Sequence, residues 1–171
     1  MRAYFMKTER IGFSTWNDKD IEIATSLWSD PSVTKFISVN GKFDNIQIKE
    51  KLENEILNKK QYDVQYWPIF ALNTNENIGC CGLRPYDLDK GIYEIGCHLK
   101  PKFWGKGFAS EAGKAVIDFA FLKLGAQNLF AGHNPNNTAS KKFLTQLGFT
   151  YTHDEYYQPT GLQHPSYIYY K

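Results

Sequence analysis

Apolar residues recur along the chain at two different spacings, and each spacing predicts a different kind of element. A helix is expected from Ile21 to Trp28, where apolar residues return every three to four positions. Asn17 and Asp18 are typical caps before it, and Asp30-Pro31 should end it because proline disfavours helical geometry in the preceding residue. Further helices are predicted at residues 45–59, 107–124 and 138–147. Strands are predicted at residues 8–16, 65–73, 77–84, 92–100, 128–132, 149–157 and 165–170.

The resulting order of elements, βααβββαβαββ, defines the expected fold class. Consecutive hairpins next to crossover helices imply a sheet that is covered by helices. We therefore expect an α/β (α+β) fold with a mixed, mostly antiparallel central sheet flanked by helices on both faces. At 171 residues, and without a repeat, linker or low-complexity stretch, the chain fits a single domain over residues 1–171.

Composition narrows the class of protein. Apolar residues make up 42% and charged residues 22%, as in ordinary globular proteins, and a net charge of +2 is too small to argue for nucleic acid or membrane as a partner. Cys80, Cys81 and Cys97 lack the CxxC spacing of a metal site, so we expect reduced strand residues and no metal. Because Met1 to Arg10 lacks the apolar core of a signal peptide, a cytoplasmic protein is expected.

The most informative segment runs from Tyr93 to Ala112, where a predicted strand leads through a glycine loop into a helix. Gly105 and Gly107 remove the side chains that would keep a phosphate away, and the free N–H groups of the helix start point at an anion. The Walker spacing GxxxxGK is absent, and a dinucleotide fingerprint is weak because its third glycine position is Ser110. The segment therefore predicts a phosphate-binding loop of another kind.

Lysines add positive charge around this loop. Lys100, Lys102 and Lys106 flank it, and Lys141 and Lys142 belong to the start of a later helix. We expect these cations to gather where an anionic cofactor lies. The alternative is that they are simply solvated.

The chain resembles the GNAT acetyltransferases over nearly its whole length, and within them the RimJ/RimL branch, whose members acetylate ribosomal protein N-termini. The resemblance rests on Thr8-Glu9-Arg10, Ser29-Asp30-Pro31, the block from Glu94 to Ala112, Asn137-Thr138-Ala139-Ser140 and Leu147-Gly148-Phe149. It implies a single-domain GNAT-like fold and transfer of an acetyl group from acetyl-CoA, the cosubstrate, to a primary amine.

The resemblance also implies which residues contact the cofactor. Gly105 to Ala109 would hold the CoA pyrophosphate, the backbone of Cys97 to Leu99 would pair with pantetheine, and Asn137 would contact the same arm. The full expected set is Cys97, His98, Leu99, Trp104, Gly105, Lys106, Gly107, Phe108, Ala109, Asn137 and Lys141.

Direct attack by an amine needs a base, because α-amino and lysine groups have reference pKa values near ~8 and ~10.4. Glu94 is the candidate, since strand alternation puts Glu94, Gly96 and His98 on one face, and the family often has its base on this strand. A surface carboxylate paired with a lysine is the alternative for Glu94, and a packed side chain is the alternative for His98.

The resemblance implies two further roles. The backbone N–H of Leu99 would stabilise negative charge on the thioester oxygen. Many relatives protonate the departing thiolate with a tyrosine, but Leu144 stands at that position here, so Ser140 is expected to act instead, with helix capping as its alternative role. Cys97 lacks a base arrangement and is expected to be structural rather than a nucleophile.

The acceptor is left open at this level. Tyr156 and Tyr157, with Asp154 and Glu155, either line an acceptor pocket or belong to packed strands and a solvated turn. The acceptor amine is a protein N-terminus or a small molecule such as a polyamine, an amino acid or an antibiotic, and the protein is a monomer or homodimer. Because Leu144 stands where many relatives have a tyrosine, one alternative function is an acyl-CoA-binding sensor without catalysis. A ribosome-associated role is weakened by the low net charge.

Overall fold

An eight-stranded sheet forms the centre of the molecule, and the computed structural model describes all 171 residues around it. The strands are β1 (Met6–Lys7), β2 (Ile11–Phe13), β3 (Tyr66–Ala71), β4 (Asn77–Asp87), β5 (Ile92–Leu99), β6 (Asn128–Gly132), β7 (Thr150–Tyr157) and β8 (Leu162–Tyr170). Their spatial order is β1-β2-β3-β4-β5-β6-β8-β7. Only β5 and β6 pair in parallel, so the predicted mixed, mostly antiparallel sheet is confirmed.

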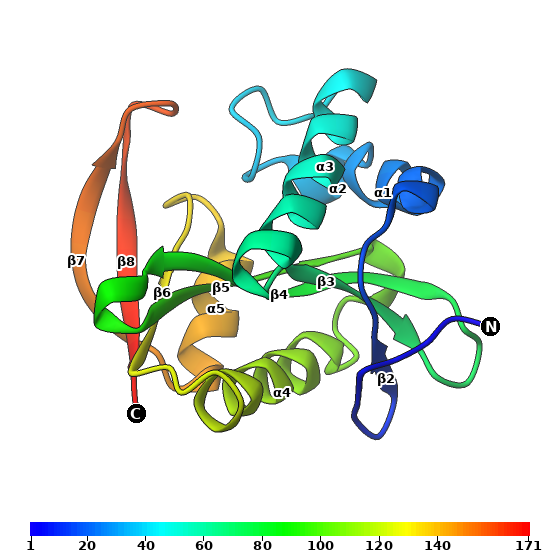
Figure 1. Cartoon of the computed structure of the whole chain (residues 1–171). Helices are drawn as coiled ribbons and strands as arrows, with labels where there is room; N and C mark the ends of the chain where they lie inside the picture. The colour runs from blue at the N-terminus through cyan, green and yellow to red at the C-terminus, as the bar shows by residue number, and fades with distance from the viewer.

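Helices cover both faces of this sheet, as the sequence predicts (Figure 1). One face carries α1 (Ile21–Trp28), α2 (Pro31–Thr34) and α3 (Asn45–Tyr62), and the other carries α4 (Phe108–Leu122) and α5 (Thr138–Leu147). Short 3-10 turns lie at Asp18–Asp20, Leu88–Lys90 and Pro101–Phe103. None of the helices combines the length and apolarity that crossing a membrane requires.

Each face of the sheet has its own hydrophobic core. On the α4 side, Ala112, Val116 and Ala120 are fully buried against the strands, because their small side chains let the helix approach closely. On the other side, Trp28 of α1 and Ile48 of α3 are fully buried over the sheet. Burial of each large apolar side chain contributes roughly 1.5–3 kcal/mol, so both layers are held firmly to the strands between them.

Side chains cap several helix ends. Asn17, a predicted cap, accepts a hydrogen bond from the backbone N–H of Lys19 at the 3-10 turn that leads into α1. Asp44, which was not predicted, accepts one from the backbone N–H of Gln47 at the start of α3. Gly148 closes α5 with φ 97°, in the left-handed region that favours glycine.

One prediction about the first forty residues is wrong and another is confirmed. Of the single strand expected over residues 8–16, only Ile11–Phe13 is a strand, because the chain turns at Thr8 to Arg10 and β2 pairs back on β1 before that turn. Asp30-Pro31 follows the end of α1 as predicted, and Pro31 also begins α2, where the Asp30 side chain caps the new turn. Proline suits this first helical position because its missing N–H would have no partner there.

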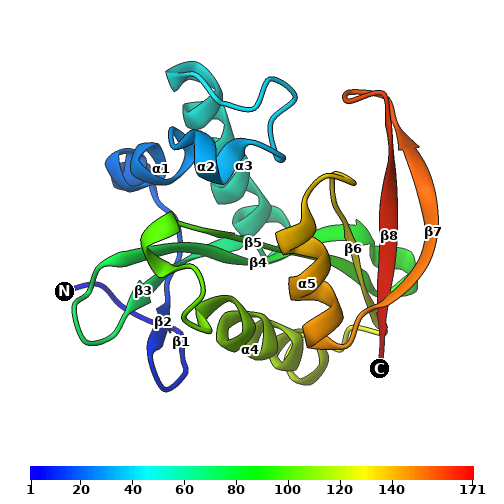
Figure 2. The same ribbon diagram turned by 180° about the vertical axis from the view of Figure 1, so that it is seen from behind.

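The β7–β8 hairpin forms one edge of the sheet, and its tip reaches toward the side that carries α1 to α3 (Figure 2). For Tyr156 and Tyr157 the sequence left packing and an acceptor pocket as alternatives, and both side chains are exposed, at 61% and 48%, as is Tyr151 at 52%. Tyr167 of β8 is buried. The difference arises because β7 is the outer strand of the sheet, and no helix or strand covers its residues.

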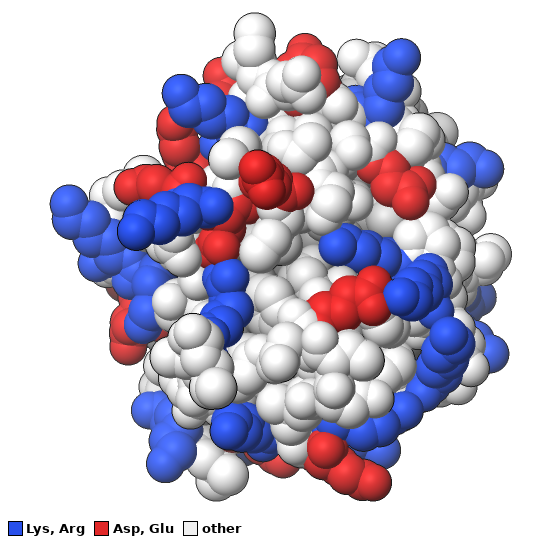
Figure 3. All heavy atoms as spheres, turned by 90° about the vertical axis from the view of Figure 1, so that its right-hand side faces the viewer, with Lys and Arg blue, Asp and Glu red and all other residues white.

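On the face in Figure 3, charged side chains of both signs are interspersed among uncharged residues, and acidic side chains lie next to lysine or arginine in several places. This agrees with a net charge of only +2.

Candidate active site

The two parallel strands β5 and β6 separate part of the way along their length. They pair from Ile92↔Asn128 to Glu94↔Phe130, and no pairing follows, although β5 continues to Leu99. Beyond this point β6 pairs only with β8 on its other side. The carboxyl half of β5 therefore has an open edge inside the sheet.

Backbone groups of β5 face this opening. The N–H of Lys100 donates to the carbonyl of Ile78 at 2.9 Å, so the backbone groups of Lys100 point toward β4. Because these directions alternate along an antiparallel strand, the N–H groups of Cys97 and Leu99 point to the opposite, open edge. The carbonyl of Leu99 already accepts a hydrogen bond from Trp104 Nε1, at 2.8 Å, on that side.

The glycine loop that follows β5 also presents unused donors. Gly105 and Gly107 have φ values of 68° and 80°, in the left-handed region that favours glycine, and Gly107 precedes α4. No backbone N–H from Gly105 to Ser110 donates a hydrogen bond within the chain, and the first backbone bond of the helix runs from Glu111 to Gly107. These free N–H groups at a helix start are suited to an anion.

The turn from Thr8 to Arg10 holds this loop in place. Arg10 donates to Glu111 Oε2 at 2.7 Å and to the carbonyl of Lys106 at 3.0 Å, and its guanidinium lies 4.3 Å from the centre of the Phe108 ring. Thr8 donates to Glu111 Oε1 at 2.5 Å. Partial burial acts to raise the pKa of Glu111, but the hydrogen bonds from Thr8 and Arg10 and the arginine charge hold it below its usual range. These contacts connect the turn to the glycine loop about a hundred residues later and restrain the position of that loop.

A single cavity of about 1190 Å³ joins the glycine loop, the open edge of β5, the start of α5 and the tip of the β7–β8 hairpin. Most predicted site residues line it: Glu94, Cys97, His98, Leu99, Trp104, Gly105, Gly107, Phe108, Ala109, Asn137 and Ser140. Lys106 and Lys141 do not. The structure thus brings together residues from four separate segments.

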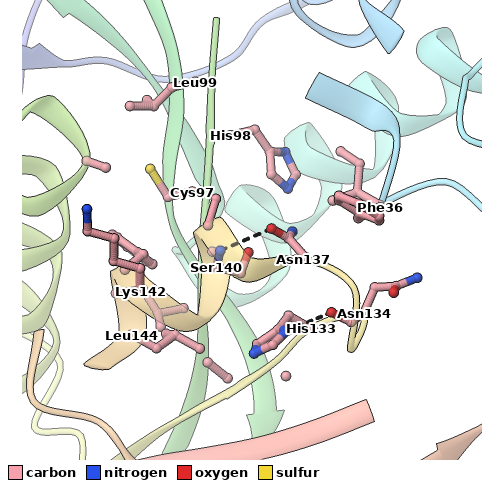
Figure 4. A pocket seen from close by; sticks show the side chains of 18 of the residues that line it. Phe36, Cys97, His98, Leu99, His133, Asn134, Asn137, Ser140, Lys142 and Leu144 are labelled. Carbon is pink, nitrogen blue, oxygen red and sulfur yellow. Dashed lines mark hydrogen bonds between the residues drawn. The ribbon is translucent and has the colours of Figure 1, made fainter. Parts of the chain in front are cut away.

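The lysines are arranged differently from the expectation. Lys102 forms an ion pair with Glu76, at 2.7 Å, and Lys106 Nζ donates to the carbonyl of Lys102. Lys142 lines the cavity in place of Lys141 (Figure 4), because successive residues of a helix point in different directions. Free donors for an anion therefore come more from the loop backbone than from the lysines predicted beside it.

The start of α5 contributes two side chains (Figure 4). Asn137 caps the helix, and its Oδ1 accepts from the backbone N–H of Ser140 at 3.0 Å. The Asn137 Nδ2 group and the Ser140 hydroxyl have no partner within the chain, and both residues line the cavity. Helix capping, the alternative role for Ser140, is thus performed by Asn137.

A tyrosine lies across the face of β5 on which Glu94, Gly96 and His98 are predicted to align. Tyr66 of β3 lies over Gly96, where a Cβ atom would be only 2.2 Å from the tyrosine Cζ. Its hydroxyl donates to Glu94 Oε1 at 2.6 Å, and its ring meets His98 edge to face with centres 5.6 Å apart. Burial and the Glu94 charge raise the pKa of Tyr66, so the hydroxyl stays protonated and remains a donor. The glycine is required here by this close approach.

The protonation of His98 follows from its partners. Burial, with the charges of Lys51 and Arg84, holds the pKa of His98 well below its usual range, so the ring is neutral. Trp28 Nε1 donates to His98 Nδ1 at 3.3 Å, which leaves the proton on Nε2. His98 therefore offers the cavity a hydrogen-bond donor.

Several cavity residues were not identified from the sequence. Arg84 lies 3.8 Å from the centre of the Tyr66 ring and forms an ion pair with Glu55, which is 1% exposed. Lys51 of α3 also lines the cavity. His133 contacts the carbonyl of Asn134 at 2.7 Å and the Tyr167 hydroxyl at 3.4 Å, and burial lowers its pKa. No local motif marks these residues, because they are brought to the site by packing.

The comparison with known families identifies the class of protein that this fold and cavity define. Residues 10–150 match the acetyltransferase (GNAT) domain. A curated relative, an uncharacterized N-acetyltransferase p20 of Bacillus licheniformis, is 35% identical over 144 residues, which are 83% of this chain and 80% of that protein. The chain therefore belongs to the GNAT acetyltransferase family.

Solved structures share the fold over almost the whole chain. A GNAT-family acetyltransferase from Bacillus anthracis has a TM-score of 0.81 at 22% identity, covering 96% of this chain and 97% of the other. RimL, a ribosomal L7/L12 alpha-N-protein acetyltransferase in complex with coenzyme A, has a TM-score of 0.82 at 14% identity, covering 98% of both chains. The expected GNAT-like fold is confirmed. The chain is an acyl-CoA-dependent N-acetyltransferase, and acetyl-CoA is its cosubstrate.

Proposed function

We propose that this enzyme transfers the acetyl group to a primary amine by direct attack inside the cavity between β5 and β6. The observation that carries the proposal is the continuity between the free amides of Gly105 to Ser110, the open edge of β5 and Glu94. A cosubstrate that is anionic at one end and reactive at the other fits such an arrangement.

Binding of the cosubstrate is assigned to backbone groups first. The N–H groups from Gly105 to Ser110 would hold the diphosphate, aided by the positive end of α4. The backbone of Cys97 and Leu99 would pair with the amides of the pantetheine arm, as a missing neighbouring strand would. Asn137 Nδ2, which has no partner within the chain and belongs to a cavity-lining residue, would donate to the same arm.

The bound cosubstrate supplies a thioester, an activated acyl group that needs no covalent enzyme intermediate. Glu94 accepts the proton that the attacking amine gives up, directly or through one water, as the N–C bond forms and the C–S bond breaks. The Leu99 N–H faces the carbonyl oxygen and stabilises charge there. Ser140 Oγ passes a proton to the departing sulfur and regains one from solvent.

The side of the sheet that carries α1 to α3 is the proposed entrance for the acceptor. Tyr86, Glu155 and Tyr156 line the cavity there, and Tyr86 stacks on Phe130 with ring centres 4.0 Å apart. A relationship to the RimJ/RimL branch is supported by RimL among the similar structures, although other GNAT proteins are equally similar. A cytoplasmic location and a monomer or homodimer stay predictions from the sequence.

Release of the CoA thiol, measured with a panel of primary amines, tests this function. We expect turnover with at least one class of amine, and a Glu94→Gln enzyme that is slower by roughly 10²- to 10⁴-fold at neutral pH with unchanged affinity for acetyl-CoA. Binding of acetyl-CoA without thiol release across the panel would favour the non-catalytic sensor. A wild-type rate and pH profile in Glu94→Gln would remove Glu94 from the mechanism.

A further inference from the structure

Lys51 is a partly buried cation that has no hydrogen-bonding or ion-pair partner within the chain. It belongs to α3 and lines the cavity, yet its Nζ forms neither an ion pair nor a hydrogen bond. Its Nζ lies over two aromatic rings, 5.1 Å from the centre of the Trp28 ring and 5.5 Å from that of Phe43. A buried ammonium without a hydrogen-bonding partner is costly, and such groups are usually paired.

The nearby carboxylates are already engaged. Glu55 forms an ion pair with Arg84 and accepts the backbone N–H of Tyr66 at 2.8 Å. Glu94 has one oxygen bound by the Tyr66 hydroxyl, and it also lines the cavity. Arg84 and Glu55 neutralise each other. Lys35 and Glu155 also line the cavity, but Glu94 is the carboxylate without an ion-pair partner whose charge acts on Lys51. Lys51 and Glu94 are therefore the pair of opposite charges that remains beside α3.

This pair of opposite charges is complementary to a molecule that carries both an amino group and a carboxylate. Resting on the proposed function, we propose that the acceptor is a small amino-carboxylate of the amino acid type, whose carboxylate is bound by Lys51 while its amino group lies at Glu94. The carboxylate supplies the partner that Lys51 lacks. Trp28 and Phe43 cover part of the ammonium with apolar surface, which lowers the local dielectric and strengthens such an ion pair.

A protein N-terminus fits this arrangement less well. The first residue of a protein has an amide in place of the carboxylate, so Lys51 would remain unpaired when such an acceptor binds. A polyamine would bring a second cation toward Lys51. Both are therefore expected to be poorer acceptors than an amino acid.

Matched acceptors test the proposal. Rates of CoA thiol release are compared for L-amino acids and the corresponding L-amino acid amides, which differ only at the carboxyl group. We expect kcat/KM to favour the acid by roughly 10- to 100-fold, the range of one hydrogen bond to a charged group. The amide has the less basic amino group of the two, so easier deprotonation cannot produce this preference.

Three variants assign the preference to Lys51. Lys51→Met keeps an unbranched side chain without charge and should remove the preference, whereas Lys51→Arg should keep most of it. Lys60→Met is the control, because Lys60 is exposed on the same helix and should leave the preference unchanged. Thermal unfolding of Lys51→Met should show no loss of stability, since the substitution removes the cost of burying an ammonium.

A binding measurement separates this inference from the proposed function. N-acetyl-L-alanine and N-acetyl-L-alaninamide, the two product-like compounds, are titrated into the CoA-loaded enzyme by calorimetry, which requires no turnover. Tighter binding of the acid that is lost in Lys51→Met supports the proposal even if the rate assay fails. Equal turnover of acids and amides, or a preference that persists in Lys51→Met, would overturn it while leaving acetyl transfer intact. Acetylation of Lys51 itself, found by mass spectrometry of the intact protein after incubation with acetyl-CoA, would also contradict it.

Discussion

Gly96→Ala is the substitution whose effect follows most directly from the packing around Glu94. The new Cβ would lie 2.2 Å from Cζ and 2.3 Å from the hydroxyl oxygen of Tyr66, far inside van der Waals contact. Tyr66 is 4% exposed, with Arg84 over its ring and His98 at its edge, so it cannot move aside without losing these contacts.

Gly96→Ala should lower the free energy of unfolding in two ways. Overpacking of a filled site costs about 1–3 kcal/mol, and loss of the hydrogen bond from Tyr66 to the Glu94 carboxylate costs about 1.5–3 kcal/mol. We expect a net loss of roughly 2–4 kcal/mol in the free energy of unfolding, because relaxation spares part of each. For a chain of this length that corresponds to a fall in Tm of roughly 5–15 °C.

Thermal unfolding followed by circular dichroism measures this change, and CoA thiol release shows whether the displaced Glu94 loses activity. Gly132→Ala is the matched control for stability, since its Cβ would meet the nearest atom, Phe130 Cζ, at an ordinary 3.4 Å. Its effect should stay below ~1 kcal/mol. A Gly96→Ala protein with the Tm and rate of the wild type would refute the account of Tyr66 and Glu94.

Four further predictions concern separate parts of the site. Ser140→Ala should lower kcat about tenfold with an unchanged Tm, whereas Asn137→Ala should cost about 1 kcal/mol of stability, because Asn137 is the helix cap; equal loss of Tm in the two variants would contradict this division of roles. Cys97→Ala should keep most activity, and loss of turnover with intact acetyl-CoA binding would instead indicate a covalent intermediate. Arg10→Met should raise the KM for acetyl-CoA several-fold with little change in kcat, since Arg10 holds the loop and touches no acceptor; an unchanged KM would mean that the loop needs no clamp. Burial and the neighbouring Arg84 charge lower the pKa of Lys51 to about 8, against the smaller opposing effects of Glu55, Cys80 and Glu94. Because Lys51 loses its charge above that pH, affinity for N-acetyl-L-alanine should fall as pH rises through about 8. The Lys51→Arg protein, whose guanidinium stays charged, should show no such fall.

The local parts of the fold were predictable because they depend on residues close in sequence. Gly105 and Gly107 mark a backbone conformation that few other residues adopt, and they defined the loop before α4. Gly148 likewise marked the end of α5. Alternation along β5 predicted that Glu94, Gly96 and His98 share one face, and Tyr66 contacts all three positions.

The remaining features depend on contacts between distant segments. That β5 and β6 part after Glu94 is a property of strand pairing, which no spacing in the sequence encodes. Tyr66 of β3 reaches across β4 to Glu94 of β5, which lies 28 residues later in the sequence. Lys51 reads as one of many charged residues on a solvated helix, and only the packing of α3 over the sheet buries it. The exposure of the β7 tyrosines was left open because alternation indicates a sheet but does not reveal an outer strand.

Calorimetric titration with acetyl-CoA tests most directly the central claim that the amides from Gly105 to Ser110 hold its diphosphate. The informative comparison is Gly107→Glu with Gly125→Glu. Both glycines have positive φ, 80° and 66°, so both substitutions carry the same backbone cost of roughly 1–2 kcal/mol, but only Gly107 lines the cavity. We predict that Gly107→Glu weakens binding at least a hundredfold while Gly125→Glu binds like the wild type. Equal affinity of the folded Gly107→Glu protein and the wild type would contradict the account.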